Sequence, residues 1–80
     1  MKKNQLFTAV IHRENNGYVA LCPELDVVSQ GDSIEEARDN LREAVELMLE
    51  TADTEEIAAR LSGEVYVTAL DVRFEGVGVG

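Results

Sequence analysis

The sequence contains few of the residues that stabilise very small domains. Its 80 residues form one small domain, with a single cysteine, Cys22, and a single histidine, His12. One cysteine excludes an internal disulfide and a cysteine-based zinc site, and one histidine disfavours a histidine-rich metal site. Because so short a chain usually needs a disulfide, a metal ion or a partner chain, we expect a homo-oligomer, either a dimer or a tetramer.

Positive charge is also scarce. Seven Lys and Arg residues oppose sixteen Asp and Glu residues, the net charge is −9, and no lysine follows Lys3. Such a surface repels nucleic acid phosphates and anionic membranes and attracts basic proteins. The apolar runs are too short to span a bilayer, and the first residues lack the features of a secretory signal. We therefore predict a cytoplasmic protein that contacts neither membrane nor nucleic acid directly.

No group of residues marks a catalytic centre. His12 is expected at the surface and Cys22 to be a buried thiol, since no nearby cation would activate it. No glycine-rich loop precedes a helix. The sequence therefore predicts no enzyme, no catalytic residue, no metal and no cofactor. One alternative stays open, in which Glu24, Asp26 and Asp32 gather at one end of a sheet and hold Mg²⁺.

Four strand-like runs are visible. Residues 6–13 and 18–22 flank a turn containing Asn16-Gly17, which predicts a β-hairpin. Residues 27–30 form a short third strand. Residues 64–75 alternate apolar and polar side chains and are rich in β-branched and aromatic residues, so they are predicted to form a fourth strand.

A long helix is predicted after Gly31. Ser33 and Glu36 have the spacing of a capping box, and apolar residues then recur at intervals of three and four as far as Glu50. This stripe comprises Ile34, Ala37, Leu41, Ala44, Val45 and Met48. A shorter helix is expected from Asp53 to Leu61. The predicted fold class is α+β in the order β-β-β-α-(α)-β, with an antiparallel sheet and the long helix on one face. Residues 1–75 form the domain and residues 76–80 a flexible tail.

Both faces of the predicted sheet carry apolar side chains. In the last strand Val65 and Val67 lie on one side, and Tyr66 and Leu70 on the other. One helix covers only one face, so we expect the second face or a strand edge to meet another copy of the chain. Alternatively, the shorter helix folds over that second face.

The acidic residues are concentrated in the helical region. Residues 32–56 contain ten acidic residues and two arginines, which gives −8 of the total charge of −9. On a helical wheel the acids opposite the apolar stripe fall within an arc of about 100°. They are Glu35, Glu36, Asp39, Glu43, Glu46 and Glu50. Two interpretations stand: a solvated helix face, or a surface that binds a basic protein.

Three segments in order resemble the HicB-like antitoxin family. They are Gly17-Tyr18-Val19-Ala20-Leu21-Cys22-Pro23-Glu24-Leu25, then Ser29-Gln30-Gly31-Asp32-Ser33, then Glu35-Glu36-Ala37. The matched positions that we interpret as fold determinants are Gly17, Tyr18, Pro23, Glu24, Gln30, Gly31 and Ser33. The resemblance implies a β-β-β-α-β fold likened to part of ribonuclease H. It also implies that the chain neutralises a small basic, mRNA-cleaving toxin of the HicA type.

The sequence departs from that family in two places. Many members carry a C-terminal DNA-binding segment, whereas this sequence ends at Gly80, so we expect a short, stand-alone member. Asp26-Val27-Val28 also replaces the usual small-residue-Gly-Cys sequence before Ser29. Two alternatives to the antitoxin remain: an oligomeric adaptor without a toxin, and a degenerate ribonuclease-H-like nuclease that uses the three loop acids.

Overall fold

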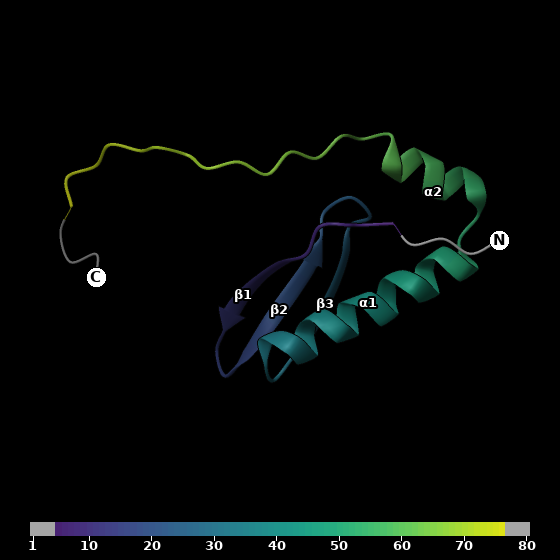
Figure 1. Cartoon of the computed structure of the whole chain (residues 1–80), viewed down its shortest axis with the longest axis horizontal. Coiled ribbons are helices and arrows are strands. Elements are labelled where there is room, and N and C mark those ends of the chain that lie inside the picture. Colours follow the sequence, from purple (N-terminus) through teal and green to yellow (C-terminus); the bar gives the residue numbers. More distant parts are fainter. Residues whose placement is uncertain (1–4, 77–80) are drawn as a thin grey trace.

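The computed structural model describes residues 5–76 and shows an α+β fold (Figure 1). Three antiparallel strands form a sheet in the order β1-β2-β3, and two helices follow. The elements are β1 (Val10–Glu14), β2 (Gly17–Cys22), β3 (Val27–Gly31), α1 (Ile34–Thr51) and α2 (Thr54–Leu61). The predicted fold class is confirmed, and both predicted helices and the first three predicted strands are present, although β1 begins at Val10 rather than at residue 6.

The hairpin between β1 and β2 is tight. Glu14 pairs with Gly17, so the turn consists of Asn15 and Asn16, and the positive φ (55°) falls on Asn15. The sequence places Gly17 in the turn, which indicates a role in turn geometry, but the structure shows a different reason for glycine at this position. A Cβ at Gly17 would lie 3.0 Å from the carbonyl oxygen of Gly31, on the neighbouring end of β3. A close approach of two strands, rather than turn geometry, therefore favours glycine here.

The turn between β2 and β3 contributes to the core. Pro23 directly follows the last residue of β2, as predicted, and Leu25 donates its backbone N–H to the carbonyl of Cys22 at 3.3 Å. Asp26 has a positive φ of 57°, a conformation that Asp tolerates better than most residues. The turn places the side chain of Leu25 fully inside the core.

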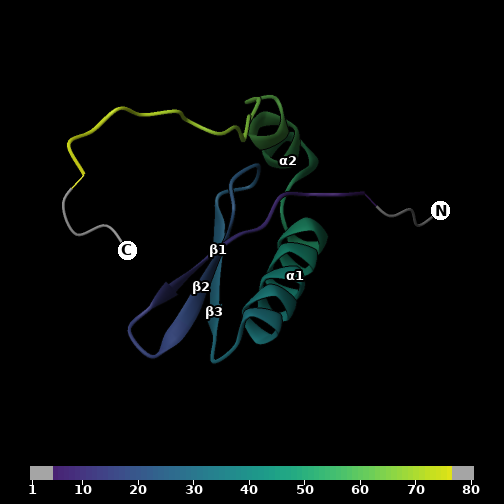
Figure 2. The same ribbon diagram turned by 60° about the vertical axis from the view of Figure 1, so that its left-hand side comes forward.

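The molecule has two layers, with α1 packed along one face of the sheet (Figure 2). The core lies between them and is small. It comprises Ala20, Cys22, Leu25, Ala37, Leu41 and Val45. Of the predicted helical stripe, Ile34 is half exposed, because it lies in the first turn of α1, beyond the core.

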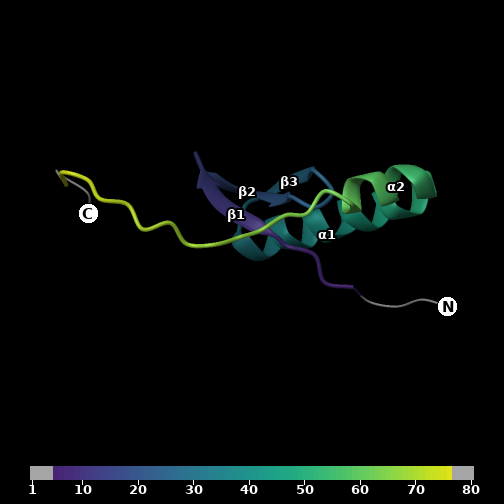
Figure 3. The ribbon, with the colours of Figure 1, turned by 90° about the horizontal axis from the view of Figure 1, so that it is seen from above.

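Helix α2 lies beyond the sheet end that carries the β2–β3 turn (Figure 3). The guanidinium of Arg60 donates a hydrogen bond to the carbonyl of Leu25 and forms an ion pair with Glu56. The opposite face of the sheet stays open, since Val10 and Val28 are 41% and 59% exposed. The alternative in which α2 covers that face is therefore wrong.

The predicted fourth strand does not join this sheet. Residues 64–75 are extended, but within the described residues they pair with no strand and are exposed throughout. They run away from the two-layer body, and the radius of gyration is 15.8 Å. A compact chain of this length would have about 12 Å. Of the predicted tail, only Gly76 is among the described residues.

Candidate functional site

The acidic face belongs to α1, whose start is fixed by local hydrogen bonds. The Oγ of Ser33 accepts the backbone N–H of Glu36 at 3.0 Å. The carboxylate of Glu36 in turn accepts the backbone N–H of Asp32 at 2.9 Å. The predicted capping interaction is therefore present, with Glu36 reaching one residue further back than Ser33. Glu36 therefore has a capping role in addition to its predicted place on the partner-binding face.

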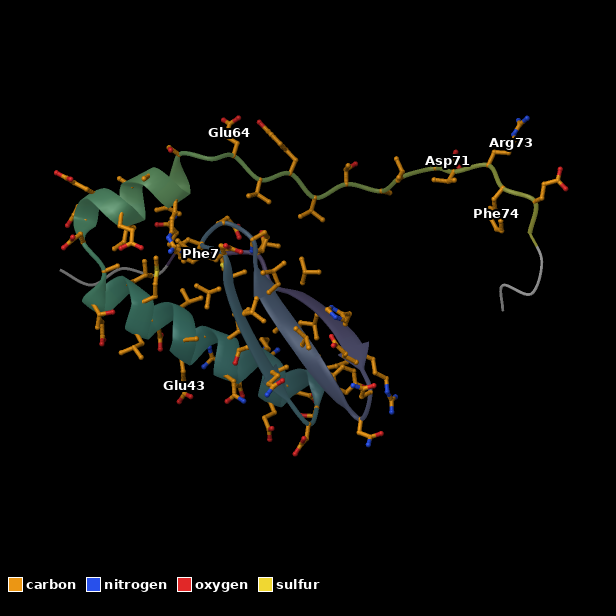
Figure 4. The ribbon with its side chains drawn as sticks, turned by 180° about the vertical axis from the view of Figure 1, so that it is seen from behind. Phe7, Glu43, Glu64, Asp71, Arg73 and Phe74 are labelled. Atoms are coloured by element: carbon orange, nitrogen blue, oxygen red, sulfur yellow. The ribbon has the colours of Figure 1, made fainter. Side chains whose placement is uncertain are left out.

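All six predicted partner-binding residues, Glu36 included, lie together on the solvent side of α1. Ala37, Leu41 and Val45 are buried against the sheet, and the carboxylates lie on the other side. Those that are exposed are Glu35, Glu36, Asp39, Glu43, Glu46 and Glu50. Figure 4 shows the Glu43 side chain pointing away from the sheet. The six residues therefore form one surface, which we call the acidic face.

Few cations balance this surface. Asp39 contacts Arg42 at 2.6 Å and Arg38 at 3.7 Å. Within residues 5–76, Glu43 and Glu46 make no ion pair. The last turn of α1 has no basic residue, although cations are favoured where the helix dipole is negative. In the C-terminal half of the acidic face, carboxylates without ion pairs among the described residues therefore lie near the negative end of the helix dipole, where negative charge is unfavourable.

An apolar side chain lies within this acidic surface. Leu47 is 60% exposed and follows Glu43 by four residues and precedes Glu50 by three, so all three share one side of the helix. Leu47 is not among the residues predicted from the sequence, because it falls outside the apolar stripe. Its position off the stripe, beside acidic residues, was the signal that could have identified it. Single exposed apolar side chains are common at protein surfaces, so Leu47 is of interest only through its position among the carboxylates of the acidic face.

A second group of polar residues lies behind the β2–β3 turn. The Glu24 carboxylate accepts the Thr8 hydroxyl at 2.7 Å, the Thr8 backbone N–H at 2.9 Å, and the Cys22 thiol at 3.6 Å. Partial burial raises the pKa of Glu24, but hydrogen bonds from Thr8, from the backbone of Glu24 itself and from Cys22 together outweigh burial, so the pKa lies below the usual value. Burial raises the pKa of the Cys22 thiol, and the Glu24 carboxylate raises it further. These bonds attach the chain before β1 to the core.

The three acids of the alternative magnesium site do not gather. Glu24 and Asp26 lie in the β2–β3 turn, whereas Asp32 follows β3 at the opposite end of the sheet. The five residues of β3 separate them by about 17 Å. Among the residues that the structure describes, no group of three His, Cys, Asp or Glu side chains is placed to hold a metal ion. The alternative arrangement is therefore wrong, because β3 carries Asp32 to the other end of the sheet.

One comparison with known proteins identifies the family. The chain is 39% identical over 70 residues to a UPF0150 protein of Helicobacter pylori (strain J99), an alignment that covers 86% of this chain and 97% of the relative. This chain belongs to the UPF0150 family. No family model matches the UPF0150 chain, and no solved structure matches it. Within residues 5–76, no helix has the length and apolarity needed to cross a membrane.

The motif residues of the UPF0150 chain take structural roles. Ser33 caps α1, and Gly31 lies beneath its first turn, where a Cβ would meet the backbone of Ala37. Asn40 of α1 donates to the carbonyl of Gln30 at 2.8 Å, which joins the helix to β3. Tyr18 packs against the core and lies under the Arg13 guanidinium, 5.7 Å from the ring centre. These residues therefore position α1 and its acidic face.

The other residues considered for chemistry lie at the surface or take part in packing. His12 is exposed and contacts the Glu14 carboxylate at 3.2 Å, as expected for a surface residue. Cys22 is the buried thiol that the sequence predicts. Tyr66 is 80% exposed, and its hydroxyl donates to Glu64 at 2.8 Å.

Proposed function

We propose that this UPF0150 chain is an antitoxin that binds and neutralises a small basic, mRNA-cleaving toxin of the HicA type. The observation that carries the proposal is the acidic face of α1, in which Glu43 and Glu46 form no ion pair with any residue between 5 and 76. The resemblance of the motif around Pro23 and Gly31 to HicB-like antitoxins, together with membership of the UPF0150 family, supports the choice of partner.

The chain would act by binding rather than by catalysis. Opposite potentials accelerate the encounter of an acidic face with a basic protein, and they disfavour partners of the wrong charge. Leu47 would enter an apolar depression on the toxin, while Glu43, Glu46 and Glu50 pair with its lysines and arginines. The carboxylates would then occupy toxin cations that otherwise contact RNA phosphates, which prevents cleavage. This interaction would take place in the cytoplasm, where mRNA is found.

The acidic face has a stability cost that a partner would remove. Glu35 and Asp39, and Glu46 and Glu50, are like-charged neighbours at i, i+4, each pair costing about 0.2–0.5 kcal/mol. A simple solvated face usually alternates charges instead. The concentration of one sign on α1 therefore favours the protein-binding interpretation over a merely solvated helix.

A pull-down from the native host tests the proposal. Tagged chain is incubated with lysate at low salt, and bound proteins are released by a salt step and identified by mass. We expect one small basic protein that cleaves mRNA and whose cleavage stops when the purified chain is added. Release of the chain's own copies alone would support the adaptor without a toxin and would contradict the antitoxin. A bait carrying Glu43→Lys and Glu46→Lys serves as the control.

A further inference from the structure

The extended segment of residues 64–75 and an unfilled groove beside β1 complement each other. We propose that this segment pairs with the free edge of β1 in a second copy of the chain and fills that copy's groove. The predicted fourth strand would then form between chains. This inference rests on shape and sequence pattern, and it holds whether or not a toxin binds the acidic face.

The groove lies where a fourth strand would place its side chains. It has a volume of about 720 Å³ and is open to solvent on the helix side of the sheet, between α1 and the chain around β1's start. Phe7 and Ala9 line one wall, and Leu41, Val45 and Leu49 line the other. Within the described residues β1 pairs only with β2, so its outer backbone edge has no strand partner. An edge of this kind readily accepts an added strand.

The segment has the form of the missing strand. Figure 4 shows residues 64–74 running extended and clear of the body, from Glu64 to Phe74. Its apolar side chains are exposed: Leu70 at 85% and Val67 at 70%. Twelve extended residues span about 40 Å, more than the length of β1 and the residues that precede it. The segment is therefore long enough to cover the whole groove.

Charge and apolar pattern together select a direction. Helix α1 runs opposite to β1, because it starts where β3 ends and β3 is parallel to β1. A strand parallel to β1 would therefore start near Leu49 and end near Arg38. Its helix-facing side would place Val65 and Val67 against the apolar end of the groove.

The same direction pairs opposite charges at the other end. Asp71 would follow on the helix-facing side and reach the part of the groove rimmed by Arg38 and Arg42. The reverse direction would bring Asp71 toward Glu46, another groove residue of the same charge. Parallel pairing with β1 therefore places the apolar part of the segment in the apolar end of the groove and Asp71 near the arginines at the other end.

Two features favour a second copy over the segment's own chain. In the single chain the segment runs clear of the body (Figure 1), and none of its residues lines the groove. The segment is also apolar on its other side, through Tyr66, Leu70, Val72 and Phe74. Folded onto its own sheet, that side would extend the exposed face formed by Val10 and Val28. Exchange between two copies brings two such faces into one assembly, where they can cover each other.

Isotope-filtered NMR on the full chain tests the proposal directly. Equal amounts of ¹³C-labelled and unlabelled chain are unfolded, mixed and refolded, and contacts between labelled and unlabelled methyl groups are recorded. We expect such contacts between Val67 and Val45 or Leu49, in a species of at least twice the 8.8 kDa of one chain. Contacts of Val67 with these residues only within one chain would overturn the proposal, as would a monomer.

A matched pair of variants separates this proposal from the antitoxin. Val67→Asp places a charge in the groove of the second copy and should lower the mass measured by light scattering to that of one chain. Leu47→Asp adds the same charge at an exposed site on α1 outside the groove and should leave the mass unchanged. A Val67→Asp protein that remains oligomeric would contradict the exchange. Weaker toxin binding by Leu47→Asp alone would concern only the antitoxin.

Discussion

Gly31 lies directly beneath the backbone of Ala37, so closely that a Cβ on Gly31 would stand 2.5 Å from the Ala37 nitrogen. Gly31 ends β3, and Ala37 is the first buried residue of α1. This contact determines how near the helix packs to the sheet. Any side chain at position 31 must push backbone away, because no flexible group is there to move.

Gly31→Ala should therefore destabilise the protein. Overpacking against rigid backbone typically costs about 1–3 kcal/mol, and we expect a loss of unfolding free energy in that range in urea denaturation. Gly63→Ala is the matched control, since its Cβ would be 3.7 Å from the nearest atom, the Arg60 carbonyl oxygen. Equal stability of the two variants would show that α1 does not pack as closely as described.

Replacing Glu24 by Gln should destabilise the protein in a pH-dependent way. The Glu24 carboxylate accepts the hydroxyl and the N–H of Thr8, and its pKa in the folded protein is lowered. Because the pKa is lower in the folded protein, the ionised carboxylate contributes its full stabilisation at pH values above the unfolded-state pKa, near 4.5. This contribution is lost as the pH falls through the folded-state pKa. We expect Glu24→Gln to cost about 1–2 kcal/mol at pH 7, and the difference from the parent to shrink below pH 4.5.

Denaturant titrations at several pH values measure this difference. Thr8→Val provides the comparison, because it removes the hydroxyl donor and keeps the backbone N–H bond to Glu24. It should show a smaller loss with the same sign of pH dependence. A stability difference that is constant from pH 7 to pH 3 would rule out the ionised carboxylate as its cause.

Arg60 should control the docking of α2. Its guanidinium joins α2 to the carbonyl of Leu25, and Glu56 pairs with the same group at 3.1 Å. Arg60→Leu removes both interactions, so amide hydrogen exchange in α2 should accelerate while α1 stays protected. Glu56→Gln removes only the exposed ion pair, worth less than about 1 kcal/mol, and should change exchange far less. Equal exchange in both variants would mean that the bond to Leu25 does not hold α2.

Local features of this fold could be read from the sequence, whereas the partners of its elements could not. The helix start depends on Ser33 and Glu36, which are only three residues apart in the sequence. The hairpin likewise depends only on two strands that follow each other along the chain. Residues 64–75 show the limit of such reasoning. Their alternation indicates a strand, but a strand forms only where an edge accepts it, and alternation does not say which edge or which chain.

Most of the candidate site could be read from the sequence. The acidic face follows from helical periodicity, so its six members lie on one side of α1 as predicted. The separation of the three loop acids could also be read from the sequence, because the strand predicted at residues 27–30 lies between Asp26 and Asp32. Leu47 is not among the predicted site residues because it lies off the apolar stripe, although its place beside acidic residues could have identified it.

Reversing two charges on the acidic face should weaken toxin binding. Glu43→Lys with Glu46→Lys changes the local charge by +4 at exposed positions without ion pairs in the described structure. Both substitutions introduce positive charge in the C-terminal half of α1, where the helix dipole favours it, so the helix should remain folded. We expect affinity for the basic protein recovered by pull-down to fall by about tenfold or more in equilibrium titrations at low salt.

Glu75→Lys is the matched control for the double reversal, since it changes an exposed carboxylate outside α1 and should have the smaller effect.

Salt provides a second criterion. At about 1 M salt the screening length is about 3 Å, so the parent and the double variant should bind with similar, weaker affinities. An affinity loss that persists at high salt would point to Leu47 and apolar contact as the main determinant. Unchanged affinity at low salt would remove the acidic face from the binding surface.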